Sequence, residues 1–234
     1  MLKKIMKIKK FLVLFFVCQT ILLFSQKIGI AESYNSSFKH AHLKGMFNMT
    51  IDKVEDLDYN IKPFIDSLFA QKNIDLAEIS NFDWPLIDKF SAKYGNREIE
   101  NYLYGLCEKE NFDSIIIIKS FGNKENKNNI LANDLYPELD YGIVSFENPK
   151  KSVFYYNNII FLYYSKNDNK LRYPVLKKNE NLFYDLNPIK FDEIVFDMET
   201  KKLVKTIPFK NQFLKDYKTR LQLNIDKVIS QIKK

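Results

Sequence analysis

The segment FDSIIIIKSF (residues 112–121) places the strongest constraint on how this chain can fold, because it contains four consecutive isoleucines. Isoleucine is β-branched and favours extended backbone. Successive side chains of a strand point to opposite faces of a sheet, so an unbroken apolar run needs cover on both faces. We therefore predict a strand in the centre of a sheet, with further elements packed on each side.

Helical spacing of apolar residues marks the chain before this strand. Residues 58–73 carry apolar side chains three and four positions apart, and Pro63 is tolerated in a first helical turn. Trp84-Pro85 predicts a turn into a short second helix. Residues 96–111 have one charged and one apolar face, which predicts a third helix.

The stretch before these helices carries a weaker signal. Residues 32–44 are polar and show no periodic apolar pattern, so we expect a loose lead-in there. A first strand is expected over 42–51.

Runs typical of strands dominate the second half of the chain. The expected strands span 141–148, 152–165, 170–176, 193–198 and 202–209. The run 152–165 is either one long strand or a hairpin bent at Asn157-Asn158, and Pro174 favours a sheet edge for 170–176. Residues 210–234 are amphipathic and predict a closing helix.

This order of elements favours an α+β fold. We expect helices in the first half, a mainly antiparallel sheet with a meander in the second half, and a closing C-terminal helix. The expected inward side chains of that helix are Phe213, Leu214, Tyr217, Leu221, Val228, Ile229 and Ile232.

The N-terminus has the pattern of a secretory signal peptide. Residues 1–10 contain five lysines and no acid, and residues 11–24 are almost entirely apolar. The apolar stretch is shorter than the about 20 residues that a membrane-spanning helix needs. Gly29 and Ala31 provide small residues for cleavage before Glu32.

Two alternatives to that cleavage remain open. One is cleavage near Ser25 or Gln26. The other is an uncleaved signal anchor that holds the domain at the inner membrane. We therefore predict a signal peptide over 1–31 and one globular domain over 32–234, exported to the periplasm, the cell envelope or the medium.

Charge is unevenly distributed along the chain. Residues 1–31 hold six lysines and no acid, so most of the net charge of +7 leaves with the signal peptide. Residues 201–234 hold ten Lys or Arg against two Asp, which is typical either of a solvated helix face or of a tail that contacts an acidic partner. We favour the solvated face. Export argues against nucleic acid, so the expected partner is an envelope protein or a polar ligand, with a membrane only if the N-terminal segment stays uncleaved.

Histidine and cysteine are too scarce for most familiar catalytic or metal sites. His40 and His42 would share one face of a strand, where Asp52 or Glu55 could join them, yet zinc usually takes three or four protein ligands. Two histidines also exclude most Ser-His-Asp and Cys-His mechanisms. We expect Cys107, in a predicted helix, to be a small buried hydrophobe. The sequence thus predicts no metal, no cofactor and no catalytic set.

The tetrapeptide Asp197-Met198-Glu199-Thr200 has one feature of a phosphotransferase nucleophile. Such enzymes place an aspartate after an apolar strand, with a second carboxylate nearby for acid–base work. In this chain Glu199 stands where a second aspartate belongs, and only 34 residues follow Thr200. A turn between two strands is the plainer interpretation.

Two further features could serve a ligand or a substrate. Gly122 opens a polar loop over 122–129, which lacks the spacing of a phosphate-binding loop but could bind a polar ligand. Carboxylates are abundant, and two at a suitable separation could hydrolyse a glycoside. The acids considered are Asp56, Asp58, Asp134, Glu138, Asp140, Asp185, Asp192 and Glu193.

Three segments, DWPLID (83–88), FDSIIIIKS (112–120) and YGIVSF (141–146), together with the leader, make the chain similar to small exported proteins of Bacteroidota-type bacteria. The resemblance spans residues 80–234 and implies no activity, so no site residue follows from it. The expected function is an exported, non-enzymatic binding or structural module of the bacterial cell envelope. The alternatives are a small carboxylate-dependent hydrolase and an inner-membrane-anchored periplasmic domain.

Overall fold

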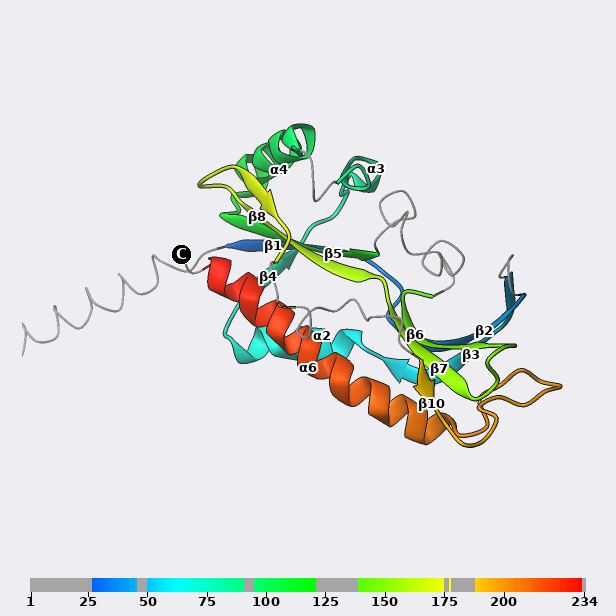
Figure 1. The fold of residues 1–234 in the computed structure, drawn as a ribbon. Coiled ribbons are helices and arrows are strands. Elements are labelled where there is room, and N and C mark those ends of the chain that lie inside the picture. The colour runs from blue at the N-terminus through cyan, green and yellow to red at the C-terminus, as the bar shows by residue number, and fades with distance from the viewer. Residues whose placement is uncertain are drawn as a thin grey trace, which may run out of the picture.

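The structure is a computed structural model that describes residues 27–45, 50–90, 95–120, 139–174, 177 and 188–232. Within these ranges the strands form two sheets of five, which we call sheet A and sheet B (Figure 1). The helices are α2 (Lys62–Gln71), α3 (Trp84–Ile87), α4 (Arg97–Glu110) and α6 (Thr206–Ile232).

Sheet A has the strand order β4-β1-β5-β8-β9. It is mixed, because β1 runs parallel to β4 and β5, whereas β8 runs antiparallel to β5 and β9. Its strands are β1 (Ile28–Ser33), β4 (Leu76–Glu78), β5 (Ser114–Ser120), β8 (Ile159–Ser165) and β9 (Lys170–Arg172).

The isoleucine run forms the central strand of sheet A, as predicted. In β5, Ile116 and Ile118 face one core, which includes residues of α2 and α6. Ile115 and Ile117 face a second core, which includes residues of α3 and α4. The helices accordingly cover opposite faces of sheet A (Figure 1), and the alternation along the strand explains why four neighbouring isoleucines can all be buried.

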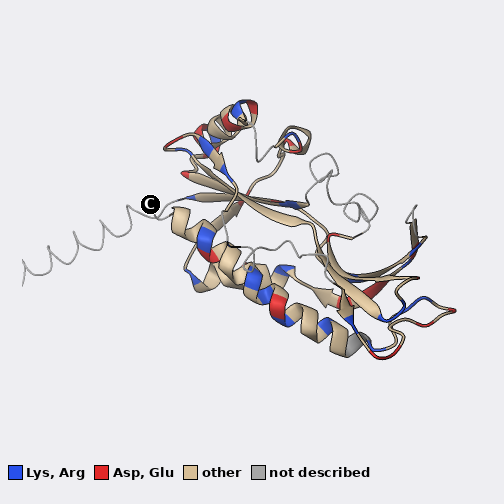
Figure 2. Ribbon diagram, in the orientation of Figure 1, with Lys and Arg blue, Asp and Glu red and all other residues tan. Residues whose placement is uncertain are grey.

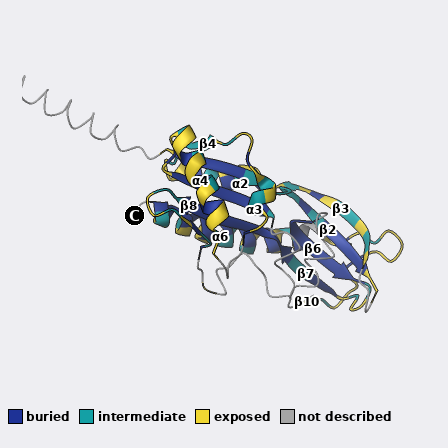
Figure 3. Ribbon diagram, turned by 90° about the horizontal axis from the view of Figure 1, so that it is seen from above, coloured by how far each residue is buried: buried dark blue, intermediate teal, exposed yellow. Residues whose placement is uncertain are grey.

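Sheet B has the strand order β10-β7-β6-β2-β3. It is mixed as well, because β2 pairs parallel with β6 and antiparallel with β3, and β7 is antiparallel to β6 and β10. Its strands are β2 (Ser37–Lys44), β3 (Thr50–Asn60), β6 (Tyr141–Phe146), β7 (Ser152–Asn157) and β10 (Ile189–Lys190). Figure 3 shows the middle strands of both sheets as largely buried, whereas the edge strand β3 and the outer side of α4 are more exposed.

Each of the three middle strands of sheet A is a neighbour in sequence of one middle strand of sheet B. The chain passes from β1 into β2, from β5 towards β6 and from β7 into β8, and the orders β1-β5-β8 and β2-β6-β7 correspond strand by strand. The two sheets therefore resemble one long sheet that is broken across its middle. We call this boundary the crease and define it by residues 34–36, Asp140 and Asn158.

Backbone approaches closely beside the crease at Gly142. Its φ is +156°, and a Cβ at this position would lie 2.0 Å from the carbonyl oxygen of Lys39 on the paired strand β2. A glycine is therefore required for β6 to begin against β2 directly after the crease.

Helix α6 spans both sheets. Its 27 residues correspond to about 40 Å at 1.5 Å per residue, and it contacts β8 of sheet A and β6 of sheet B. The predicted inward residues Phe213, Leu214, Tyr217, Leu221, Val228, Ile229 and Ile232 are all buried. Figure 2 shows basic and acidic residues along the helix, as an exposed charged face requires.

The predicted fold class was wrong in two respects. Both sheets are mixed rather than mainly antiparallel, and strands β1 to β4 occupy the first half of the chain beside the helices. Ser37–Lys44, expected as part of a loose lead-in, is the buried strand β2. Parallel pairing joins strands far apart in sequence, so no local pattern reveals it. The closing C-terminal helix was predicted correctly.

Several boundaries also differ from the prediction. Helix α2 begins at Lys62 rather than at residue 58, because β3 continues to Asn60. The run 152–165 is neither one strand nor a hairpin, since β7 and β8 pair in different sheets. The strands expected over 193–198 and 202–209 reduce to an isolated bridge between Phe196 and Leu203, and α6 begins at Thr206.

Other predicted elements are confirmed. Helix α4, Arg97–Glu110, matches the helix expected over 96–111, and β9 lies at the edge of sheet A. The loop 122–129 falls outside the described residues. Among the described residues, no helix combines the length and the hydropathy that crossing a membrane would demand.

The first strand bears on where a signal peptide could be cleaved. Residues 28–31, assigned to that peptide, belong to β1, which pairs with both β4 and β5. Cleavage before Glu32 would remove four of the six residues of this strand. The alternative site near Ser25 or Gln26 lies before the described residues and would leave β1 whole.

Candidate functional site at the crease

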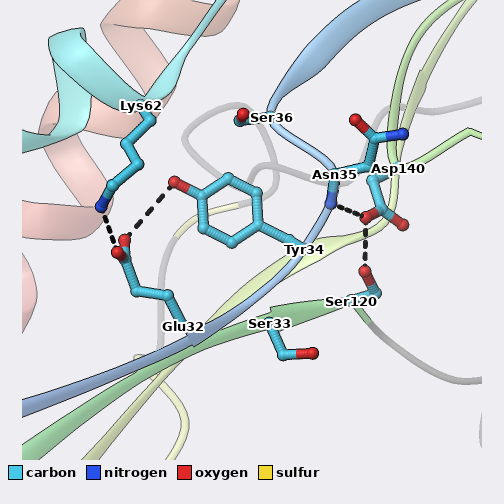
Figure 4. Close-up of a pocket in the computed structure, with 8 residues that line it drawn as sticks. All are labelled: Glu32, Ser33, Tyr34, Asn35, Ser36, Lys62, Ser120 and Asp140. Atoms are coloured by element: carbon cyan, nitrogen blue, oxygen red, sulfur yellow. Dashed lines mark hydrogen bonds and ion pairs between the residues drawn. The ribbon is translucent and has the colours of Figure 1, made fainter. Parts of the chain in front are cut away.

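The crease holds a cavity of about 490 Å³. This volume is within the range of roughly 300–1,000 Å³ that small-molecule sites occupy. Its walls come from the end of β1, the β1–β2 connection, the start of α2, the end of β5 and the residue before β6 (Figure 4). The lining residues are Glu32, Ser33, Tyr34, Asn35, Ser36, Lys62, Ser120 and Asp140.

Asp140 is the buried carboxylate of this site. Its Oδ2 accepts hydrogen bonds from the backbone N–H of Asn35 and from the Ser120 hydroxyl, the latter at 2.5 Å. Its Oδ1 is buried and has no hydrogen-bond partner in the described part of the chain. Burial raises the pKa of Asp140, although the hydrogen bonds from Ser120 and Asn35 oppose that shift.

The opposite side of the cavity carries an ion pair. Lys62, at the start of α2, pairs with Glu32 at the end of β1 and, at 3.3 Å, with Asp66. The Tyr34 hydroxyl lies 3.5 Å from Glu32 Oε1, and the Tyr34 ring lies between this pair and the Asp140 group (Figure 4). Lys62 therefore balances Glu32, whereas Lys39 is the cation whose charge acts on Asp140.

The floor of the crease contains further polar groups. The backbone N–H of Asn158 donates to the carbonyl oxygen of Asp140 at 2.6 Å. The side-chain amide of Asn158 is buried, and neither its nitrogen nor its oxygen has a partner among the described residues. Buried polar groups are usually hydrogen-bonded, and Asn158 does not itself line the cavity, so its unpaired amide suggests a place for a buried water.

The chemistry of this lining favours a ligand rich in hydrogen-bond donors. Two carboxylates offer acceptor oxygens, and the hydroxyls of Ser33, Ser36 and Ser120 can donate or accept. The ring of Tyr34 adds an apolar surface. A hydroxyl-rich molecule would satisfy both kinds of group.

The acids named from the sequence have different fates. Asp140 lines the cavity, whereas Asp192 and Glu193 line a separate cavity of about 180 Å³ before α6. Asp134, Glu138 and Asp185 fall outside the described residues. Glu32, Tyr34 and Lys62 were missed, because Glu32 and Tyr34 lay in the predicted lead-in, and nothing in the sequence showed that Lys62 would lie beside them.

The Asp197 segment forms a turn, which confirms that part of the prediction. Asp197 Oδ1 accepts from the backbone N–H of Glu199 and Thr200 and from the Thr200 hydroxyl, at 3.1, 2.7 and 2.8 Å. These hydrogen bonds, led by the backbone one from Thr200, lower the pKa of Asp197. The carboxylate is thus engaged within its own turn, although only an isolated bridge flanks it.

The two histidines share one face of β2, as predicted, and a serine lies between them. Ser145 Oγ on β6 is 2.7 Å from His40 Nε2 and 2.9 Å from His42 Nδ1. His40 Nδ1 is 2.8 Å from Glu55 Oε1, whereas Asp52 pairs with Lys44. No group of three potential metal-ligating side chains occurs among the described residues.

The order Glu55, His40, Ser145 is that of a serine hydrolase. However, His40, His42 and Ser145 are all 0% exposed. The second imidazole, His42, also occupies the free side of the hydroxyl, where a substrate would have to approach. This arrangement favours a structural role over acyl transfer.

Cys107 is buried in α4, as predicted, and belongs to the core on the α4 side of sheet A. Burial raises the pKa of its thiol to about 12. A thiol with such a pKa is protonated and unreactive near neutral pH.

Comparisons with protein-family models, with curated proteins and with solved structures gave no match to this chain. The function must therefore be argued from the site itself.

Proposed function

We propose that this protein is an exported binding module of the bacterial cell envelope, and that it takes a small hydroxyl-rich ligand, such as a saccharide, in the crease cavity. The observation that carries the proposal is the buried Asp140 carboxylate, which has one oxygen bonded to Asn35 and Ser120 and the other unpaired in the described structure. Because Oδ1 is buried, a small rotation of the carboxylate would be needed to bring it to the cavity, where a ligand hydroxyl would complete the set of hydrogen bonds. Export is supported by the N-terminal lysines and the apolar stretch that follows them.

The surrounding groups favour hydroxyls over an isolated cation. Lys62 already neutralises Glu32 at one end of the cavity. Burial raises the pKa of Asp140, which weakens its preference for a cation over a neutral donor. The ring of Tyr34 could pack against the C–H face of a sugar, as aromatic side chains do at many binding sites.

Calorimetric titration tests the proposal. Glucose, galactose and N-acetylglucosamine serve as probes, with putrescine as a cationic comparison. At least one sugar should bind to the wild type, and Asp140→Asn should weaken binding by about 10- to 100-fold, because hydrogen bonds to a charged group contribute about 1.5–3 kcal/mol.

A matched variant separates this effect from a general change in charge. Asp192→Asn removes a carboxylate from the other cavity and should leave sugar binding unchanged. Binding of putrescine alone, or equal binding by wild type and Asp140→Asn, would contradict the proposal.

A carboxylate-dependent hydrolase is the second candidate, because Glu32 and Asp140 line the same cavity. Such an enzyme would release nitrophenol from a nitrophenyl glycoside, and Glu32→Gln and Asp140→Asn would each abolish the release. Sugar binding without turnover would favour the binding module.

A further inference from the structure

Four side chains of sheet B and Glu147, the residue directly after β6, form one continuous series of hydrogen bonds. It runs from Glu55 to His40, Ser145, His42 and Glu147, with contacts of 2.8, 2.7, 2.9 and 3.3 Å. The three middle members are fully buried, whereas the Glu147 side chain is 35% exposed. The Glu55 side chain is 14% exposed, so both ends of this hydrogen-bonded chain reach solvent, the Glu147 end more than the Glu55 end.

The number of protons in this chain can be counted. Each of its four contacts needs one hydrogen atom. Two neutral imidazoles supply one each, the Ser145 hydroxyl supplies one, and ionised carboxylates supply none. Three protons therefore serve four contacts, and one contact must lack a proton unless an imidazole is charged.

The geometry shows where the missing proton belongs. Glu55 Oε1 also accepts the backbone N–H of Leu203 at 2.9 Å, so it is held as an acceptor and His40 Nδ1 must donate to it. The contact between His40 Nε2 and Ser145 Oγ is the shortest of the four, so we assign it the Ser145 proton, and Ser145 then accepts from His42 Nδ1. His42 Nε2 is left facing Glu147 across the longest contact, 3.3 Å.

Glu147 has a second donor at the same oxygen. Lys201 Nζ lies 3.4 Å from Glu147 Oε2. Lys201 belongs to the turn over residues 196–204, which the bridge between Phe196 and Leu203 closes and which we call the 196–204 turn. The same turn contacts this series of hydrogen-bonded side chains at two other points. Phe196 packs on the His42 ring at 4.2 Å between centroids, and Leu203 donates to Glu55.

We propose that His42 Nε2 is a proton-binding site, and that its protonation moves Glu147 from Lys201 to His42 and loosens the 196–204 turn on sheet B. The new contact is a charge-assisted hydrogen bond, which is stronger than the one it replaces. The imidazolium also repels Lys201, the other cation beside Glu147. The turn thus loses the ion pair between Lys201 and Glu147 when the hydrogen-bonded series gains its fourth proton.

The charges around His42 set the direction of this switch. Burial lowers the pKa of His42. The charges of His40 and Lys201 lower it further, whereas Glu147 raises it. On the neighbouring strand β3, Lys53 stands opposite His42 in the register and Asp52 pairs with Lys44. Because the pKa is lower in the folded state than the ordinary 6.5, neutral His42 stabilises the fold above that pH, and the contribution is lost as the pH falls below 6.5.

Nitrogen NMR of the histidine rings and hydrogen exchange of the backbone test the proposal together. On acidification the added proton should appear on His42 Nε2, and the amides of residues 198–203 should exchange about two- to fivefold faster after correction for intrinsic rates, the range that one ion pair gives. In Lys201→Gln the acceleration should vanish, whereas Lys205→Gln, which removes a pair with Glu193, should retain it.

Two results would overturn the proposal. One is a proton that arrives on His40 rather than on His42. The other is an acceleration that survives in Lys201→Gln. Because the Lys201 side chain is partly exposed whereas His42 is fully buried, this variant should fold even where a change at His42 does not. Sugar binding at the crease involves none of these residues, so either proposal can fail without the other.

Discussion

Tyr217 of α6 donates a hydrogen bond to Asn157 Oδ1 at 2.5 Å, at the point where the chain leaves sheet B for sheet A. The Asn157 side-chain nitrogen in turn donates to the carbonyl oxygen of Ile159, on the other side of the break. The Tyr217 ring also stacks on Tyr141, with 5.2 Å between centroids and 10° between planes. Helix α6 therefore holds the chain where it passes from β7 to β8, next to the crease.

Tyr217→Phe should destabilise the protein. The substitution keeps the ring stack but leaves the buried Asn157 oxygen without this donor, which costs about 1–3 kcal/mol. Tyr104→Phe is the matched control, because Tyr104 is 42% exposed and its loss should change the free energy of unfolding by less than about 0.5 kcal/mol. Urea denaturation measures both, and equal stability of the two variants would contradict this account of the crease.

Two glycine-to-alanine substitutions should have opposite effects. Gly142→Ala places a Cβ 2.0 Å from the Lys39 carbonyl oxygen, so strands β2 and β6 must separate, and the loss should be about 1–3 kcal/mol. Gly105→Ala lies within α4 with nothing within 4 Å of the new methyl group. It should stabilise by about 0.5–1 kcal/mol through helix propensity. Thermal unfolding checks the signs, and a neutral Gly142→Ala would refute the close approach.

Two truncated chains distinguish the proposed cleavage sites. A chain that begins at Lys27 keeps β1 whole and should unfold cooperatively. A chain that begins at Glu32 loses Ile28 and Ile30, both buried in the core on the α2 and α6 side of sheet A. Each such loss costs about 2–5 kcal/mol, against a total stability of about 5–15 kcal/mol. Circular dichroism during urea denaturation should show a transition for the first chain only, and an equally stable second chain would remove the argument for cleavage near Ser25 or Gln26.

Asp140→Asn should change how stability depends on pH. Because burial raises the pKa of Asp140 above its ordinary 3.8, the folded state favours the neutral acid. Its contribution to stability is full below pH 3.8 and is lost as the pH rises through the higher pKa of the folded state. The variant should lack this loss, so the stability of the variant relative to the wild type should rise from pH 3 towards pH 7. A constant difference between the two proteins from pH 3 to 7 would argue against a buried Asp140.

Strongly periodic segments were predictable from the sequence, and the reason is physical. The four isoleucines of β5, the two faces of α4 and the inward residues of α6 are each determined by their own spacing. By contrast, β1 directly follows the apolar N-terminal segment, so its apolar residues could not be told apart from those of that segment.

The candidate site was far less predictable, because it depends on strand order. Glu32, Lys62, Ser120 and Asp140 meet at the crease only because β1, β5 and β6 begin or end there. Ser145 lies between the two histidines only because β2 pairs in parallel with β6. Such pairings join residues about a hundred positions apart, and no local pattern records them.

The most direct test of the crease as a binding site is a map of backbone amide shifts by NMR during titration with N-acetylglucosamine, glucose and galactose. We expect the amides of Ser33, Asn35 and Ser36 to move with a saturating dependence on at least one sugar, and to stay still in Asp140→Asn. Shifts confined to other parts of the chain, or no shift with any of the three sugars, would contradict the account.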